Sequence, residues 1–151
     1  MKKYHGTLNE KDSEMIKMND ECIFCKIVRK ELPSHTLYED DEILVFLDLY
    51  PASKGHTLYI PKEHISTLYD MSENNMVFLK KLPMIAKKLK ETVNATGLNI
   101  LQSNGKDAGQ VIEHIHFHLI PRYPEDQLMT LVPKAQLSDD EAKPIVENFQ
   151  K

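Results

Sequence analysis

The chain has 151 residues, of which 41% are hydrophobic and 28% are charged, and its formal net charge is −4. This length fits one domain that can bury a core, and the acidic balance argues against nucleic-acid binding, which depends on basic surface. No apolar run approaches the ~20 residues of a transmembrane helix, and the polar N-terminus lacks the apolar segment of a secretory signal. We therefore expect a cytoplasmic protein with neither a membrane nor a nucleic-acid partner.

The N-terminal part of the chain predicts a short helix and three strands. Residues 1–20 are polar and without periodicity, so we expect an extension there, followed by a single domain over residues 21–151. Residues 22–30 favour a short helix. Apolar runs bounded by turn residues predict strands at 36–40, 43–48 and 56–61.

A long helix is expected after these strands. Ser72 is a good N-cap, and Gly97 is typical of a helix end. Pro83 should kink this helix, because proline cannot donate the backbone hydrogen bond of a helix interior. The apolar residues that recur at helical spacing are Met76, Leu79, Leu82, Ala86, Leu89 and Val93.

The remaining elements complete an α+β fold. Strands are predicted at 98–102 and 113–120, and Ser138 with Glu141 forms a capping-box pattern for a short C-terminal helix, with Pro144 in its first turns. We expect an antiparallel sheet of about five strands that carries the one long helix. Such a sheet is small for the apolar content, so pairing with a second copy into a homodimer would bury more surface.

Three histidines alternate strictly along the last predicted strand. Because successive side chains of a strand point to opposite faces, His114, His116 and His118 should share one face. Imidazoles titrate near neutral pH and need hydrogen-bond partners when buried. A neutral imidazole is also a good nucleophile toward phosphorus, so this row favours phosphoryl or nucleotidyl transfer.

Two further motifs accompany the histidines. Cys22 and Cys25 form a C-x-x-C pair, which by itself is either a redox pair or half of a tetrahedral zinc site completed by two histidines. The loop before the histidine strand contains Gly109, whose lack of a side chain lets backbone N–H groups approach a phosphate. His56 adds another imidazole at the start of a predicted strand.

These motifs together resemble one known family. Residues 109–120 read GQVIEHIHFHLI, and CIFCKIV, FLDLYPASKGHTLYIPKEH and GLNILQSNGKDAGQ precede them in that order. Over residues 22–123 the chain resembles the histidine triad (HIT) superfamily, and most of all its bacterial Hit and Hint-like branch of nucleotide-binding phosphoramidases. The resemblance implies the HIT-like fold and a purine nucleoside monophosphate, or its phosphoramidate, as ligand.

The resemblance also implies roles for individual residues. His116 would attack phosphorus and become nucleotidylated, while His118 and His56 orient it and bind phosphate oxygens. Asp48 would hold the ribose hydroxyls. The rest of the implied nucleotide site is Ile23, Phe24, Ile27 and Leu49 at the base, and Ser103, Gly109, Gln110 and the backbone of Val111 at the ribose and phosphate. Bacterial members with this cysteine pattern often bind structural zinc, and that ligand set maps to Cys22, Cys25, His64 and His114.

The chain departs from the family pattern at two positions. Ser103 stands where the family often has Asn or Gln, and Val111 stands where it often has Ser or Thr. The valine side chain cannot donate a hydrogen bond to a phosphate or a leaving group. We therefore expect nucleotide binding to persist, whereas turnover with amine leaving groups is open.

Three alternatives to a phosphoramidase remain. A dinucleoside polyphosphate hydrolase is one, because residues 119–122 also resemble that branch of the superfamily. A regulatory nucleotide-binding protein with weak catalysis is favoured by Ser103 and Val111. A module that only binds zinc would leave Asp48, His56 and the glycine loop without a role.

Overall fold

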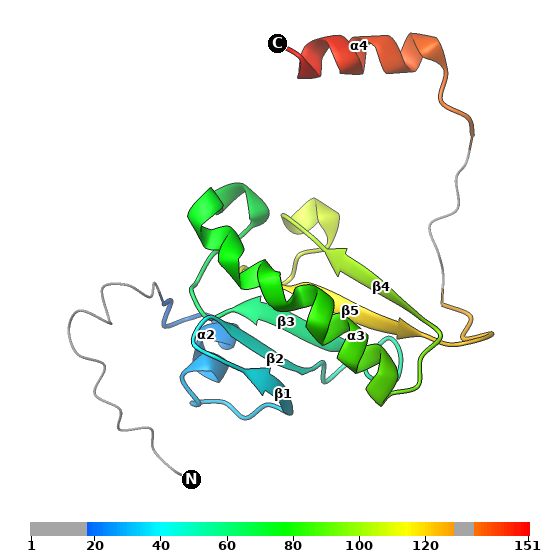
Figure 1. Ribbon diagram of the computed structural model, residues 1–151. Coiled ribbons are helices and arrows are strands. Elements are labelled where there is room, and N and C mark those ends of the chain that lie inside the picture. The colour runs from blue at the N-terminus through cyan, green and yellow to red at the C-terminus, as the bar shows by residue number, and fades with distance from the viewer. Residues whose placement is uncertain (1–17, 129–134) are drawn as a thin grey trace.

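The computed structural model describes residues 18–128 and 135–151 (Figure 1). Most of the predicted N-terminal extension, residues 1–17, lies outside the described residues. The elements in chain order are α2 (Ile23–Val28), β1 (Thr36–Glu39), β2 (Ile43–Leu47), β3 (Thr57–Pro61), the 3-10 helices η1 (Leu68–Asp70) and η2 (Glu73–Lys81), α3 (Leu82–Thr92), β4 (Gly97–Gln102), the 3-10 helix η3 (Lys106–Ala108), β5 (Phe117–Arg122) and α4 (Asp139–Phe149). Within the described residues no helix is long and apolar enough to cross a membrane.

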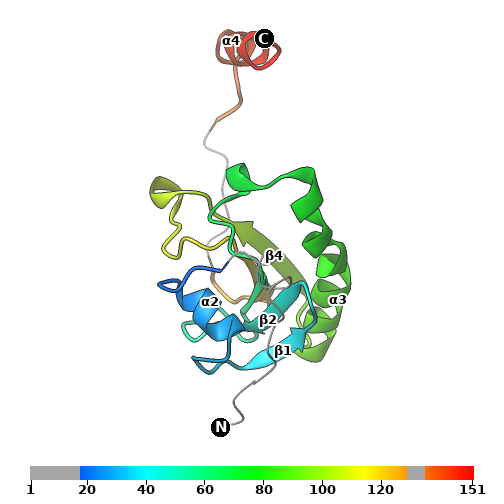
Figure 2. The same cartoon turned by 90° about the vertical axis from the view of Figure 1, so that its left-hand side faces the viewer.

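The five predicted strands form one antiparallel sheet in the order β1-β2-β3-β5-β4. The helices α2 and α3 lie on opposite faces of this sheet (Figure 2). Strand β2 is buried on both faces, since Ile43 and Val45 join the core cluster under α3 whereas Leu44 and Phe46 join the cluster under α2. The α+β architecture is therefore confirmed, with apolar packing on both sides of the central strands.

The long helix differs from its prediction. The segment is a 3-10 helix that gives way to an α-helix, and Pro83 lies in the first turn of α3 rather than at a kink. Pro83 has no N–H to donate to the Leu79 carbonyl, which accepts from the Leu82 N–H in the 3-10 pattern instead. The helix also ends before Gly97, because Asn94 adopts the left-handed conformation with φ 54°.

The histidine strand is also shorter at its start than predicted. Strand β5 begins at Phe117, so of the three histidines only His118 is in the ladder. Strand β4 ends at Gln102 directly opposite Phe117, which leaves the preceding residues without a partner on that side. The Ile115 N–H donates instead to the Ile65 carbonyl, at 2.7 Å.

The C-terminal helix is confirmed, but it is as long as α3. Both helices have 11 residues, and the Ser138–Glu141 capping box is present at the start of α4. Figures 1 and 2 show α4 standing apart from the sheet.

Candidate functional site

The predicted site residues converge on the face of the sheet that carries α2. Pairing of β3 with β5 places His118 opposite Leu58, which belongs to the core cluster under α2. The Phe24 ring of α2 contacts His114 and His116 edge-on, with centroid distances of 5.7 and 5.2 Å. The three histidines thus lie on one side of the sheet, as predicted, although two of them precede the strand.

A backbone carbonyl fixes the protonation of the His116 ring. His116 is 8% exposed, and its Nδ1 lies 2.7 Å from the His114 carbonyl oxygen. A carbonyl oxygen can only accept, so Nδ1 carries the proton and donates it. In the neutral ring the lone pair is then on Nε2, the atom that a nucleophile toward phosphorus requires.

A chain of hydrogen bonds sets the protonation of His56 and His118 in the same way. The Ala52 backbone N–H donates to His56 Nδ1 at 2.9 Å, so the neutral His56 ring carries its proton on Nε2. That Nε2 lies 2.9 Å from His118 Nδ1 and donates to it. His118 is left with its proton on Nε2, where it can donate to a phosphate oxygen or a leaving group.

Burial keeps these imidazoles neutral. It lowers the pKa of His116 and His56 below the ordinary 6.5. Burial, together with the neighbouring rings of His116 and His56, lowers the pKa of His118 to about 4. At neutral pH the rings of His116, His56 and His118 are therefore uncharged.

A titration of the folded protein followed by NMR tests this protonation. We expect the ring C–H signals of His116 and His118 to shift with midpoints below 6.5, near 4 for His118. The same chain unfolded in urea should titrate near ~6.5, which serves as the reference. Because the unfolded chain binds more protons between these values, the folded state should lose stability as the pH falls below 6.5. A midpoint of His116 at or above that of the unfolded chain would contradict the assignment.

Asp48 lies beside this pair of histidines. Its Oδ1 accepts from the Tyr50 N–H at 2.8 Å, while Oδ2 lies 3.5 Å from His56 Nε2 and 4.0 Å from His118 Nδ1. One carboxylate oxygen is therefore held by the backbone, and the other has capacity for a further donor such as a ribose hydroxyl.

The glycine loop is braced by a side chain that was predicted to serve the phosphate. Gln110 is 7% exposed. Its Oε1 accepts from the Gly105 N–H at 2.8 Å, and its amide donates to the carbonyls of Ser66 and Ile112. Gln110 thus shapes the loop from inside. The Val111 N–H has no hydrogen-bond partner among the described residues, and it remains the group offered to an anion.

The residues predicted to contact the base and the ribose differ in how exposed they are. Phe24 and Ile27 are buried in the core cluster under α2, and the Phe24 ring packs edge-on against His114 and His116. Ile23, Leu49 and Val111 are 51%, 70% and 90% exposed and present apolar surface to solvent. Ser103 is half-buried, and its carbonyl accepts from the Gln102 side-chain amide.

A second cluster has the composition of a metal site. One donor atom each from Cys22, Cys25, His64 and His114 lies within 4.8 Å of all the others. Cys22 Sγ is 3.5 Å from His114 Nδ1, and Cys25 Sγ is 3.4 Å from His64 Nδ1. Tetrahedral zinc with bonds of about 2.3 Å to sulfur and 2.0–2.1 Å to nitrogen separates such atoms by about 3.6 Å. The donor set therefore fits zinc.

A backbone carbonyl determines which nitrogen of His114 faces the cysteines. Its Nε2 donates to the Pro61 carbonyl at 2.8 Å, which leaves the lone pair on Nδ1 facing the cysteines. Burial lowers its pKa to about 4, so the ring is neutral. Burial also raises the pKa of Cys25 to about 11, so a bound cation would have to displace a proton from this thiol.

Asp48, His56 and His118 also bring donor atoms within 4.8 Å of one another. Here the hydrogen bonds argue against a cation. His56 Nε2 holds the proton that it donates to His118, and its other nitrogen accepts from Ala52. These bonds leave neither nitrogen of His56 free to bind a cation. The Ala52 N–H that orients His56 is a backbone group, so no sequence pattern indicated its role.

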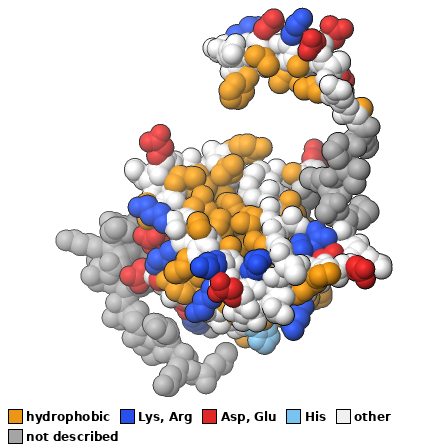
Figure 3. Space-filling model, turned by 45° about the vertical axis from the view of Figure 1, so that its right-hand side comes forward, with side chains coloured by type: hydrophobic (Ala, Val, Ile, Leu, Met, Phe, Trp, Pro, Cys, Tyr) orange, Lys and Arg blue, Asp and Glu red, His pale blue; other side chains and the backbone are white. Residues whose placement is uncertain are grey.

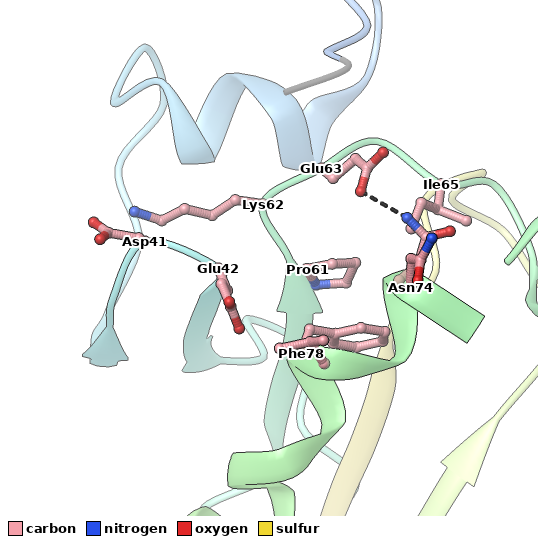
Figure 4. Close-up of a pocket in the computed structure, with 10 residues that line it drawn as sticks. Asp41, Glu42, Pro61, Lys62, Glu63, Ile65, Asn74 and Phe78 are labelled. Atoms are coloured by element: carbon pink, nitrogen blue, oxygen red, sulfur yellow. Dashed lines mark hydrogen bonds between the residues drawn. The ribbon is translucent and has the colours of Figure 1, made fainter. Parts of the chain in front are cut away.

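One hollow borders the cysteine–histidine cluster, and another lies apart from it. One of about 360 Å³ is lined by Ile23, Val111 and His64 among others, beside the predicted nucleotide site. The other, of about 220 Å³, lies between Pro61, Lys62 and Phe78 (Figure 4), where the Asn75 amide donates to Glu63 at 3.0 Å. None of the site histidines lines the second hollow, which we leave outside the site.

Comparison with known proteins identifies the family that this geometry belongs to. The family model of the HIT domain matches residues 29–125. The chain is a member of the HIT family. The family model covers the strands β1 to β5 and all three histidines at 114, 116 and 118.

Named relatives and a solved structure agree with this membership. The Bacillus subtilis protein hit is 40% identical over 121 residues, which is 80% of this chain and 83% of that protein. The adenosine 5'-monophosphoramidase hnt1 of Schizosaccharomyces pombe is 39% identical over 129 residues, 85% of this chain and 95% of that enzyme. The HIT chain is also similar to the crystal structure of SMU.412c from Streptococcus mutans, with a TM-score of 0.83, 37% identity, and coverage of 87% and 85% of the two chains.

Proposed function

We propose that this HIT protein is a nucleotide-binding hydrolase that cleaves purine nucleoside phosphoramidates through a nucleotidyl intermediate on His116. The observation that carries the proposal is the protonation of the two rings. His116 offers a lone pair on Nε2, and His118 offers an N–H beside it, with the ring centroids 4.9 Å apart. The relative named as an adenosine 5'-monophosphoramidase supports the same chemistry.

The proposed reaction has two steps. His116 Nε2 attacks phosphorus and the P–N bond breaks, while the His118 Nε2–H donates a hydrogen bond to the leaving nitrogen, which departs as the amine with a proton taken from solvent. Water then attacks the nucleotidyl-histidine, gives up a proton to solvent, and releases the nucleoside monophosphate and the neutral His116 ring. The Val111 N–H donates to a phosphate oxygen, and Asp48 accepts from a ribose hydroxyl. These two contacts keep the nucleotide bound through both steps.

A substrate panel tests the proposal. Wild-type protein is assayed with the phosphoramidates of AMP and GMP and with diadenosine polyphosphates under the same conditions. We expect both phosphoramidates to be hydrolysed with higher kcat/KM than any dinucleotide. A preference for dinucleotides would favour the alternative hydrolase, and tight AMP binding without turnover would favour the regulatory protein.

A substitution of Val111 tests whether a side-chain hydroxyl at this position speeds departure of the amine. Val111→Ser restores a hydroxyl that can donate where the family often has one, and a hydrogen bond contributes roughly 1 kcal/mol. We expect kcat for an amine leaving group to rise about fivefold to tenfold. Val111→Ala is the control, because it removes the same bulk without adding a donor. Equal rates in both variants would mean that the hydroxyl plays no part.

We also propose that zinc occupies the cluster of Cys22, Cys25, His64 and His114. The spacing and the lone pair of His114 Nδ1 support it. Bound there, zinc would act as a structural crosslink between α2, the loop after β3 and the segment that carries His116. The ion would thereby hold the start of the histidine row without taking part in the reaction.

A homodimer is the proposed assembly. Strand β4 is the free edge of the sheet next to the strand that bears His118. Its Ile100 and Leu101 are 47% and 51% exposed and point to opposite faces, because they pair with the buried Leu119 and with His118. A second copy at this edge would satisfy the open backbone and cover both side chains.

A further inference from the structure

The C-terminal helix α4 carries an apolar stripe on which none of the described residues packs. Ala142, Ile145, Val146 and Phe149 recur at the spacing that puts them on one side of a helix. Ile145, Val146 and Phe149 are 65%, 52% and 92% exposed, which is unusual for adjacent large apolar residues of a folded chain. A capped helix with such a stripe has the form of an element that docks on another surface.

A second apolar surface lies on the body of the same chain. On the α3 side of the sheet, the exposed apolar residues of η2, α3 and β4 are Met76, Val77, Met84 and Ile100, which we name the α3-side surface. Their exposed fractions run from 38% to 51%. Figure 3 shows apolar side chains gathered on the body beneath α4, with lysine and arginine side chains bordering them.

The two surfaces carry opposite charges around their apolar parts. Helix α4 contains four carboxylates and a single lysine within its 11 residues. Helix α3 contains three lysines and a single glutamate. Docking would therefore pair acidic and basic borders around an apolar centre, an arrangement that favours one orientation of the partners.

The tail that leads to α4 leaves the body at the free edge of the sheet. Arg122 at the end of β5 donates to Asn99 of β4 at 2.7 Å and to the Leu128 carbonyl at 2.9 Å. It also forms a salt bridge with Asp126, 2.7 Å between the nearest atoms. The outgoing chain is thus fastened to the edge strand where a second copy would pair.

We propose that α4 of one chain packs its apolar stripe on the α3-side surface of a second copy of this chain. Figures 1 and 2 show α4 apart from its own sheet, so the described part of one chain covers neither surface. In a pair of copies joined at β4, each tail starts at the interface and each helix covers the partner. The inference rests on the dimer proposed above and is independent of the hydrolase activity.

Crosslinking of mixed chains tests the exchange of α4. Unlabelled and ¹⁵N-labelled full-length chains are mixed until native mass spectrometry gives mixed dimers. A zero-length carboxyl–amine reagent is then applied. We expect Glu141 or Glu147 of one isotope to be joined to Lys87 or Lys88 of the other. Crosslinks only within one isotope would mean that α4 folds onto its own chain. That outcome, or the absence of any crosslink in mixed dimers, would overturn the exchange of α4 and leave the dimer proposal standing. A monomer in native mass spectrometry would overturn both.

A paired variant gives the energetic test. Ile145→Asp with Phe149→Asp places charges in the stripe, and the side chains are exposed in the single chain, so the sheet should fold unchanged by circular dichroism. We expect the dimer Kd to rise about tenfold or more, since each apolar side chain removed from water contributes on that order. Leu37→Asp on β1, at the opposite edge of the sheet and 50% exposed, is the matched control and should leave Kd unchanged. An unchanged Kd in the paired variant would overturn the proposal.

Discussion

His116→Asn should abolish hydrolysis of adenosine phosphoramidates. Asparagine preserves much of the ring's volume and can still donate to the His114 carbonyl, but it offers no nucleophilic nitrogen. Loss of a covalent nucleophile lowers kcat by about 10⁴-fold or more. We expect AMP affinity, measured by calorimetry, to change by less than about threefold, because the Val111 N–H and Asp48 keep their positions. Mass spectrometry of acid-quenched reactions should detect the nucleotidylated chain in the wild type and none in the variant.

The control for this variant is His35→Asn. His35 is exposed and lies outside the site, so its loss should leave kcat/KM unchanged. If His116→Asn retained the wild-type rate, the nucleotidyl-histidine mechanism would be wrong. If neither protein turned over any phosphoramidate while both bound AMP, the regulatory alternative would stand.

Cys25→Ser should remove zinc and lower thermal stability. Cys25 is fully buried in the four-residue cluster, and serine cannot supply a thiolate. A ligand present at a thousand times its Kd stabilises the folded state by about 4 kcal/mol. For a domain of this size that corresponds to a fall in Tm of about 10 °C. We expect metal analysis to give one zinc per wild-type chain and none in the variant.

Chelation separates the metal effect from the packing effect of the substitution. Wild-type protein treated with a strong chelator should melt close to the Cys25→Ser variant, while the variant should not respond to the chelator. Equal melting of wild type with and without chelator, or a wild type purified without zinc that takes up none on addition, would refute the zinc proposal.

Much of the fold was readable because local signals agreed. The strands β1, β2, β3 and β4 begin and end within one residue of their predicted ranges, and the Ser138 capping box starts α4 where expected. Alternation of His116 and His118 with apolar residues indicated a shared face, which the packing against α2 bears out. The prediction was wrong where one residue is compatible with two local structures. Pro83 is equally compatible with a kink and with a first turn, and only the 3-10 segment before it decides for the first turn.

The sequence by itself determined which residue types this protein has for its chemistry: a row of three histidines, a C-x-x-C pair, an acidic residue after a buried strand and a glycine loop. Side-chain identity and spacing are local properties, so they can be read without a structure. Only the tertiary structure decided what each histidine can do. The carbonyls of Pro61 and His114 and the N–H of Ala52 choose the nitrogen that carries each proton. Two of these backbone groups belong to segments more than 50 residues before the histidine row. Which nitrogen of each ring carries the proton therefore depends on long-range packing, which no local pattern in the sequence records.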